Sequence, residues 1–502
     1  MGFQKLSKYA FFSFLFLLPF QTVLLLREPI MAGEKWQYGT IGLYGTDILL
    51  LAALVFHLSS RAQSRDLHMK WRIPRFADSL GMTEGILILF LLWVGASVFW
   101  ATDTVLAGYF FAKLLLGAGV FFLARSLDDT GVGMAVKVLL AAAVIQVLIG
   151  IGQFLYQTAP ASTLLGMSAH EAWTAGTSVL KLEEGRFLRA YGSFPHPNML
   201  GGFLAAVFVL GISYLVSGIK TISVIASVAK QSREKDLSQT LSGLPRVRRL
   251  TLAMTAEWAG VLIILLALIL TFSRAAWLGV AMGIVAYCVF RILYPSHQTK
   301  SKCIIIPRPW NYDTFFKTMF VLGIATAVFV FVLRDQVFPR FDTAAIEREG
   351  SVSERVVSLR DAKTLIVEHP IIGVGAGSFT KAIMENEPDR PVWSVQPAHD
   401  VFVLVWAELG VVGAVLFVVF FLSVIASVAW RSRNQEKSLD CHGGETPPRN
   451  DRGVGLVLGN QSIIFAIAFL TLLPGLLLDH WLWSSHFGLL FFFLLAGFSN
   501  RK

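Results

Sequence analysis

Apolar runs of about 18 to 25 residues recur from one end of the chain to the other, and each is long enough to cross a bilayer core of about 30 Å as a helix. Only 15% of the 502 residues are charged, whereas soluble globular proteins carry about 25%. This composition excludes a soluble enzyme. Residues 1–502 are therefore predicted to form a single all-α transmembrane domain, a polytopic integral membrane bundle of about twelve helices. The predicted helical windows are 9–26, 40–58, 81–100, 105–124, 132–157, 197–217, 253–272, 275–293, 315–333, 399–430, 454–478 and 484–498.

The distribution of Lys and Arg residues orients these helices, because basic residues are retained on the cytoplasmic side. The connections alternate, and the set that includes both termini carries about twice as many Lys and Arg residues as the opposite set. Both termini are therefore expected in the cytoplasm, in agreement with an even number of spans. The run 9–26 resembles a secretion signal, but its length and the lack of a small-residue cleavage site favour a retained first helix.

Two long segments are expected on the outer side, residues 158–196 and 334–398. The second is predicted to hold an amphipathic helix around Glu354 to Glu368, followed by a glycine-rich turn. Loops of this length with their own secondary structure are usually functional. The cytoplasmic segments 218–252 and 431–453 are polar and basic and are predicted to be disordered.

Two motifs place arginines at the outer ends of membrane helices. Residues 189–202 read RAYGSFPHPNMLGG, in which Pro197 and Asn198 suit a helix start and Arg189 puts a cation at the mouth of the bundle. Residues 271–277 read TFSRAAW and join two apolar stretches with almost no loop, which places Arg274 at the outer membrane surface. An arginine in this position either anchors the helix end at the headgroups or faces the bundle.

A third motif combines arginines with glycines. Residues 353–379 read SERVVSLRDAKTLIVEHPIIGVGAGSF, with Arg355 and Arg360 on a short helix and Gly373 and Gly375 in the turn that follows. Glycines permit close approach of a ligand, and both exposed N–H groups and guanidinium groups match phosphate oxygens. The motif is not a P-loop, because the preceding strand and the Walker lysine are absent.

A fourth motif, HDVFVLVWAELGVVG at residues 399–413, opens a membrane helix with His399 at its outer end. An imidazole there suits proton transfer or a hydrogen bond to phosphate. Gly410 and Gly413 lie one turn apart, a spacing that permits close helix packing. Arginines and a histidine at one mouth of a helical bundle favour an anionic ligand tethered to the membrane, such as a lipid-linked diphosphate.

The ordered motifs GSFPHPN, TFSRAAW, ERVVSLRDA with HPIIGVGAGSF, and HDVFVLVWAELGVVG resemble the O-antigen ligase and O-antigen polymerase superfamily, polytopic glycosyltransferases with a GT-C-like fold. The resemblance covers residues 185–415. Its most specific part is a His, a small polar residue, nine residues and Gly-x-x-Gly, matched here by His399, Asp400, residues 401–409, Gly410 and Gly413. Asp400 departs from the Asn, Ser or Gln that is more usual in the family.

The resemblance implies transfer of a glycan from undecaprenyl diphosphate to an acceptor hydroxyl at the outer face of the bacterial cytoplasmic (inner) membrane, with anomeric inversion. The acceptor would be a lipid core, a protein or a growing glycan, in the biosynthesis of an envelope polysaccharide such as lipopolysaccharide. Arg274 and Arg355 would hold the diphosphate, with Arg360 as the alternative if the helix register differs. His399 would act as the base toward the acceptor or as a further diphosphate contact. The other substrate-binding candidates are Arg189, Asn198, Gly373 and Gly375.

A metal-independent reaction is expected, because no Asp-x-Asp sequence occurs in the chain. No cofactor and no nucleic-acid partner is expected, since the location of the basic residues orients membrane helices instead. The nearest substitute is Glu385, Glu387 and Asp389, which either ligate Mg²⁺ or Mn²⁺ or form a solvated acidic face.

Three alternatives to a ligase stay open. A polymerase uses the same donor but joins its glycan to another lipid-linked repeat unit. A transporter or flippase also fits twelve helices with both ends inside, and it would use ionisable groups near the midplane. A scaffold for envelope assembly would leave the outer arginines without a role. The candidate midplane groups are Asp47, Glu84, Lys113, Glu257 and Glu408.

Overall fold

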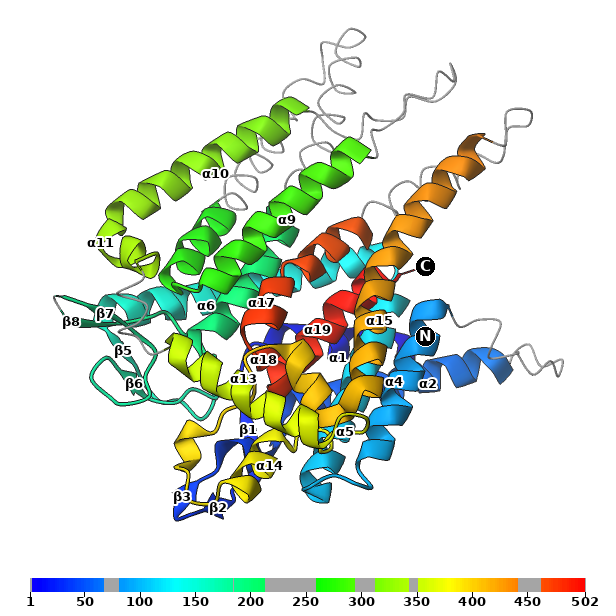
Figure 1. The fold of residues 1–502 in the computed structure, drawn as a ribbon. Helices are drawn as coiled ribbons and strands as arrows, with labels where there is room; N and C mark the ends of the chain where they lie inside the picture. The colour runs from blue at the N-terminus through cyan, green and yellow to red at the C-terminus, as the bar shows by residue number, and fades with distance from the viewer. Residues whose placement is uncertain are drawn as a thin grey trace, which may run out of the picture.

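The computed structural model describes residues 2–66, 81–183, 185–212, 259–293, 312–342, 351–440 and 462–501, and helices make up most of them (Figure 1). Glu257 and the cytoplasmic segment 218–252 lie outside the described residues, as does most of 431–453. The longer helices are α1 (Gly2–Leu17), α2 (Gly45–Asp66), α4 (Met82–Ser97), α5 (Thr104–Ser126), α6 (Asp129–Tyr156), α9 (Arg274–Leu293), α10 (Tyr312–Val332), α13 (Ser351–Glu368), α15 (Val401–Asp440) and α19 (His486–Ser499). The shorter ones are α11 (Arg334–Val337), α14 (Phe379–Asn386), α17 (Leu473–Leu478) and α18 (Trp481–Ser484).

Each of the twelve predicted windows contains a helix, but fewer helices are long and apolar enough to cross a membrane. Among the residues that the structure describes, four helices pass by length and composition, and a fifth does if the pair Met319–Val332 and Arg334–Arg340, bent by 82°, counts as one span. The four are Gly45–Ala62, Thr104–Ser126, Asp129–Tyr156 and Val401–Val428. Six shorter apolar helices accompany them: Met82–Ser97, Pro197–Ile212, Ala259–Leu270, Arg274–Val289, Ser462–Leu478 and His486–Ser499. Several of these border residues outside the described ranges, which limits their length.

The all-α prediction agrees with the described residues, which are 71% helix, apart from four short two-stranded antiparallel sheets among them. The pairs are β1 (Val23–Arg27) with β4 (Ile41–Tyr44), β2 (Ile30–Met31) with β3 (Glu34–Lys35), β5 (Thr158–Ala159) with β6 (His170–Glu171), and β7 (Val179–Leu182) with β8 (Gly185–Leu188). The first apolar run is therefore a helix followed by a strand: α1 ends at Leu17, ahead of Pro19, because a proline cannot continue a helix.

Helix α19 lies in the interior of the bundle, and each of its residues is buried. It packs along α5. Glycines permit this close approach: a Cβ on Gly117 of α5 would lie 2.5 Å from the ring of Phe493, and a Cβ on Gly497 would lie 2.5 Å from the carbonyl oxygen of Phe121. Small residues at helix contacts have this role in membrane bundles.

The segments predicted to face the cytoplasm meet at one end of the bundle. Lys8, near the N-terminus, forms an ion pair with Asp128 at 3.0 Å. Near the C-terminus, Arg501 forms an ion pair with Asp129 at 3.0 Å. The Nε of Arg125 donates to the carbonyl of Asn500. Both termini and the loop between α5 and α6 therefore lie together.

The segments predicted to be outside also meet one another. Arg27 pairs with Asp103 at 3.2 Å, and the indole of Trp36 donates to the hydroxyl of Thr380. The backbone N–H of Thr102 donates to the carbonyl of Val374. The strands, α13, α14 and α18 accordingly lie toward one end of the bundle, at the lower left in Figure 1, while α10 and α15 extend toward the other end.

Candidate active site at one end of the bundle

A buried carboxyl group lies at the junction between α17 and α18. Asp479 ends α17 in extended backbone geometry, and His480 is the residue before α18. Asp479 is 7% exposed. Its carboxyl group accepts the side-chain N–H of Asn198 at 2.7 Å and the backbone N–H of His480 at 2.8 Å. These two hydrogen bonds satisfy the buried carboxylate oxygens, and both donors are uncharged.

Asn198 is held in turn by Arg189, so two residues predicted from the 189–202 motif lie together. The guanidinium of Arg189 donates to the Asn198 side-chain oxygen at 2.8 Å, to the Ser178 hydroxyl at 2.8 Å and to the Thr271 carbonyl at 2.7 Å. Arg189 is 5% exposed. Because each of its nitrogens donates to the protein, Arg189 orients Asn198 and joins the 189–202 motif to the residues that precede Arg274.

Three imidazoles surround Asp479, and together these four residues are called the imidazole cluster: His196, His399, His480 and Asp479. The ring centroids of His399 and His480 are 5.1 Å apart, and that of Tyr38 is 5.9 Å from His480. The Nδ1 of His399 lies 3.3 Å from the hydroxyl of Ser358 in α13.

Burial makes the three imidazoles poor cations. It lowers the pKa of His399, lowers that of His480 to about 4 and lowers that of His196 to about 3. Burial alone would raise the pKa of Asp479, but the adjacent imidazoles and the Asn198 amide outweigh it, and that pKa lies below its usual value. At neutral pH the cluster therefore holds neutral imidazoles beside an ionised carboxylate, and a neutral imidazole can accept a proton.

Of the two arginines predicted on α13, Arg355 is the one whose charge acts on His399. Burial has the largest effect on the pKa of His399 and lowers it. The charge of Arg355 lowers this pKa further, and the charge of the adjacent Glu354 raises it. Arg360 is exposed, and its charge acts on Asp361 instead. The periodicity of α13 accounts for this, because residues five apart on a helix point in different directions.

Arg274 begins α9 at the same end of the molecule and is partly buried. Its guanidinium donates to the backbone carbonyl of Arg340 at 3.4 Å, so the short 3₁₀ turn Phe338–Arg340 packs beside it. Arg274 follows Thr271, whose carbonyl accepts from Arg189. The tight hairpin thus joins Arg274 to the imidazole cluster through Arg189 and Asn198.

The glycine-rich turn packs against a break in α15. Gly410 has φ 66° and ψ −175°, which interrupts the helix. The carbonyls of Ala407 and Glu408 next to this break accept the N–H groups of Val374 and Gly375 at 3.1 and 2.8 Å. The N–H of Gly373 donates to the carbonyl of His369. The positive φ values of Gly373 (67°) and Gly375 (96°) are required by this close backbone packing.

Asp400, where the chain departs from the usual family residue, caps α15. Its Oδ1 accepts the backbone N–H of Val403 at 3.1 Å. Asp and Asn cap helix starts equally well, so the departure preserves the local structure and holds His399 in the bend that precedes the helix.

The three carboxylates weighed as metal ligands, Glu385, Glu387 and Asp389, are exposed. Two of them form local ion pairs, Glu385 with Lys381 at 3.1 Å and Glu387 with Arg390 at 3.5 Å. Within the ranges that the structure describes, no three His, Cys, Asp or Glu side chains are grouped to hold a metal ion.

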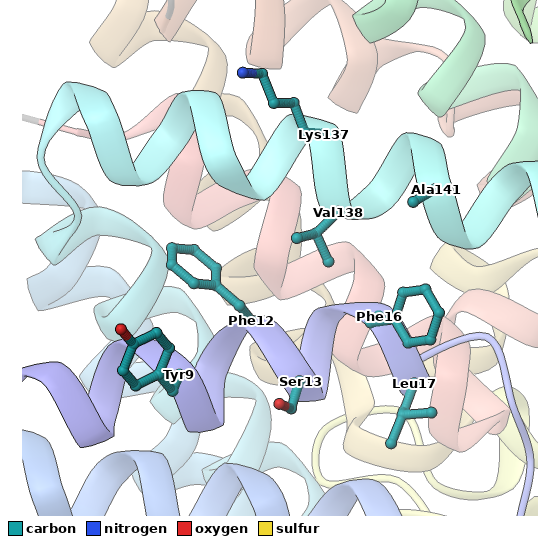
Figure 2. Close-up of a pocket in the computed structure, with 8 residues that line it drawn as sticks. All are labelled: Tyr9, Phe12, Ser13, Phe16, Leu17, Lys137, Val138 and Ala141. Carbon is teal, nitrogen blue, oxygen red and sulfur yellow. The ribbon is translucent and has the colours of Figure 1, made fainter.

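An apolar hollow of about 620 Å³ opens between α1 and α6. Figure 2 shows Phe12 and Val138 in the gap between the two helices, while the amine of Lys137 points away from it. This mostly apolar lining suits a hydrocarbon chain.

Sequence analysis does not identify four residues of this site: Tyr38, Asp479 and His480 lie outside the motifs, and His196 lies in the 189–202 motif without a predicted role. The available signal was Asp479–His480 directly after an apolar run, at an outer helix end. These residues come from segments far apart in the chain and meet only through helix packing.

Comparison with known proteins supports the resemblance. Residues 259–418 match the family model described as O-Antigen ligase (Wzy_C). A comparison with curated proteins finds no match. The matched range contains Arg274, Arg355 and His399, while His196 and Asp479 lie outside it. The match indicates a ligase- or polymerase-type enzyme that uses a lipid-linked glycan donor and an acceptor, and with the apolar helices it indicates an integral membrane protein. The O-antigen ligase match over residues 259–418 supports placing this chain in the O-antigen ligase superfamily.

Proposed function

We propose that the protein transfers a glycan from undecaprenyl diphosphate to an acceptor hydroxyl at the outer face of the cytoplasmic membrane, as an O-antigen ligase. The observation that carries this proposal is the imidazole cluster, in which His196, His399 and His480 gather beside the buried carboxyl group of Asp479, with Arg355 close to His399. It is supported by the family match, which includes His399 and both diphosphate candidates, Arg274 and Arg355.

In this proposal His399 is the general base. Its Nδ1 faces Ser358, so Nε2 takes the proton of the acceptor hydroxyl. The hydroxyl oxygen bonds to the anomeric carbon as the bond from that carbon to the diphosphate oxygen breaks, which inverts the configuration. The negative charge of Asp479 stabilises the imidazolium that forms, as a buried carboxylate does in a catalytic triad. The low pKa of His399 favours the base role over that of a cationic diphosphate ligand.

The leaving group is a diphosphate, so negative charge grows on its bridging oxygen as the bond breaks. Arg274 and Arg355 are proposed to stabilise that charge, because fixed guanidinium groups bind phosphate oxygens in a bidentate manner. This would make the reaction independent of a metal. Arg189 contributes by orienting Asn198, and Gly373 and Gly375 contribute by letting the loop pack against α15.

Twelve crossings with both termini in the cytoplasm, in a GT-C-like arrangement, are part of the proposal. The meeting of both termini with the loop between α5 and α6 supports it. The transporter alternative is weakened, because four of its five candidate groups have partners inside the protein. Lys113 pairs with Asp47, Glu84 pairs with Arg125, and Glu408 accepts the Trp483 indole at 2.9 Å.

The test is transfer by the purified full chain in nanodiscs, with an undecaprenyl diphosphate-linked glycan as donor. A lipid-core acceptor and a second lipid-linked glycan are supplied separately, each with and without EDTA. Glycosylation of the lipid core that survives EDTA supports the metal-independent ligase, and joining of two lipid-linked glycans identifies a polymerase instead. Movement of the donor across a proteoliposome membrane without any transfer would overturn the proposal in favour of a transporter.

A further inference from the structure

Glu408 is a buried acidic residue within the membrane helix α15 that has no role in the chemistry proposed above. It is 3% exposed. An acidic side chain inside a membrane span is costly and is retained where specific donors satisfy it. The donors of Glu408 come from two segments that are remote in sequence.

The first donor is Trp483 in α18, whose indole N–H donates to Oε2 of Glu408 at 2.9 Å. Trp483 follows His480 within the same short segment and packs against the rings of Phe90, Phe110 and Phe417. The bond between Trp483 and Glu408 therefore ties the segment that carries Asp479 and His480 to α15.

The second contact is with the start of α14. The backbone N–H groups of Gly377 and Phe379 interact with the Glu408 carboxyl group, and Phe379 is the first residue of α14. Ser378, which precedes this helix, makes no capping hydrogen bond with its side chain. Because the free N–H groups of a helix start favour an acidic partner, Glu408 acts as the cap that the local sequence lacks.

The backbone at Glu408 adds a third connection. Its carbonyl accepts from Gly375 at 2.8 Å, next to the helix break at Gly410. A Cβ on Gly373 would lie 2.3 Å from the Glu408 carbonyl oxygen. The turn that follows α13 thus packs against the backbone of α15 at Ala407 and Glu408. Since α13 carries Arg355 and Ser358, the distance of this helix from His399 depends on that packing.

We propose that Glu408 is a positioning residue that holds α13 and the Asp479–His480 segment at their working distance from His399. This inference rests on the proposed glycosyl transfer. Glu408 touches neither the donor nor the acceptor. It acts through Trp483 on one side and through the turn at residues 373–379 on the other.

Hydrogen exchange tests the contact without relying on activity. In full-length protein in nanodiscs, Glu408→Leu removes both side-chain acceptor oxygens and keeps the backbone carbonyl, and we expect exchange of the amides in residues 374–379, led by Gly377 and Phe379, to accelerate at least about tenfold. Glu408→Gln keeps one acceptor oxygen and should give a smaller increase. Glu385→Gln, an exposed change in α14 of the same loop, is the control and should leave exchange unchanged. Unchanged exchange in Glu408→Leu would overturn the inference.

Kinetics then separate positioning from a general loss of folded enzyme. Loss of folded enzyme lowers apparent kcat and moves neither KM nor the pH profile. If α13 withdraws in Glu408→Gln, the donor KM rises several-fold as Arg355 moves. His399 also becomes less buried, so the acid limb of kcat/KM shifts to higher pH. The charged and titratable groups that face His399 are Arg355, Glu354, Asp479, His480 and His196.

Trp483→Phe is the second variant. It removes one donor, retains the ring packing and should give a smaller effect of the same kind. A fall in kcat alone, with unchanged KM and pH profile in both variants, would contradict positioning. If the wild-type protein transfers no glycan but exchange at residues 374–379 responds to Glu408→Leu, the proposed function fails while the contact stands.

Discussion

Two buried polar groups among the described residues, the Lys113–Asp47 pair and the imidazole cluster, are built differently. In the first, Lys113 forms a direct ion pair with Asp47, and both side chains are buried, 7% and 1% exposed. The amine of Lys113 also lies 4.7 Å from the centre of the Tyr44 ring. In the imidazole cluster, the hydrogen bonds to Asp479 come from the neutral Asn198 side chain and a backbone N–H.

This difference determines which of the two groups can take up a proton during a reaction. A direct pair of opposite charges in a dry interior is satisfied in one protonation state, and changing that state leaves an unpaired charge. The imidazole cluster holds bases that are neutral and a carboxylate that is ionised. It can therefore take up a proton during a reaction. The ion pair is a structural link, and the cluster is the place for chemistry.

The largest expected effect on transfer comes from the cluster. His399→Ala removes the proposed base, and a positioned general base contributes about 10²- to 10⁴-fold in rate. We expect kcat to fall by that amount, with the thermal unfolding temperature nearly unchanged. His369→Ala, an exposed histidine after α13, is the control and should retain activity. Full activity in His399→Ala would remove the cluster from the mechanism.

The ion pair should show the opposite pattern, a loss of stability with little loss of chemistry. Lys113→Met leaves Asp47 buried without its cation, and breaking one side of a buried pair costs about 3 to 5 kcal/mol. Thermal unfolding in detergent should report this loss, while kcat per folded molecule stays near the wild-type value. The double variant Asp47→Asn with Lys113→Met should recover part of the stability. A large loss of kcat in folded Lys113→Met would instead give the pair a functional role.

The two arginines of α13 sharpen the comparison within a single helix. Arg355 acts on His399 while Arg360 is exposed. Removing one preorganised donor to a developing charge costs about 10²- to 10³-fold in rate. Arg355→Ala should lose this much in kcat/KM for the lipid-linked donor, and Arg360→Ala should lose little. Equal losses in both variants would contradict the assignment of the diphosphate to one face of α13.

The motifs predicted the parts of the site that are local in sequence. Arg189 and Asn198, from one motif, are hydrogen bonded, and Arg355 lies near His399, while the roles that the resemblance implies for these residues stay predictions. Asp479 and Tyr38 could not be found in the same way, because helix packing alone brings their distant segments to His399. The helical windows were also well placed, since long apolar runs leave the backbone few alternatives to a helix.

The glycine pattern illustrates why a motif alone leaves two interpretations open. Gly373 and Gly375 were predicted to let a ligand approach the backbone. In the structure the approaching group is the backbone of α15 at Glu408, whose carbonyl accepts from Gly375. A missing side chain permits both kinds of approach, and only the location of α15 distinguishes them. The short strands were missed for a related reason, because hairpins of two to five residues carry little periodic signal.

The smallest expected effect is a shift in the pH profile, and its sign follows from the burial of His399. Its pKa lies below the ordinary imidazole value, which is about 6.5. Only the neutral imidazole accepts a proton, so kcat/KM should stay level as the pH falls through that ordinary value and should decline only at lower pH. Because the unfolded chain binds this proton more readily, the fold also loses stability as the pH falls below the ordinary value.

Asp479 raises the pKa of His399 against the effect of burial, so Asp479→Asn should move the acid limb to still lower pH. A pH–rate series for both proteins measures this, and wild-type activity that instead rises as the pH falls through the pKa of His399 would show that the imidazolium is the active form, as a cationic diphosphate ligand would be.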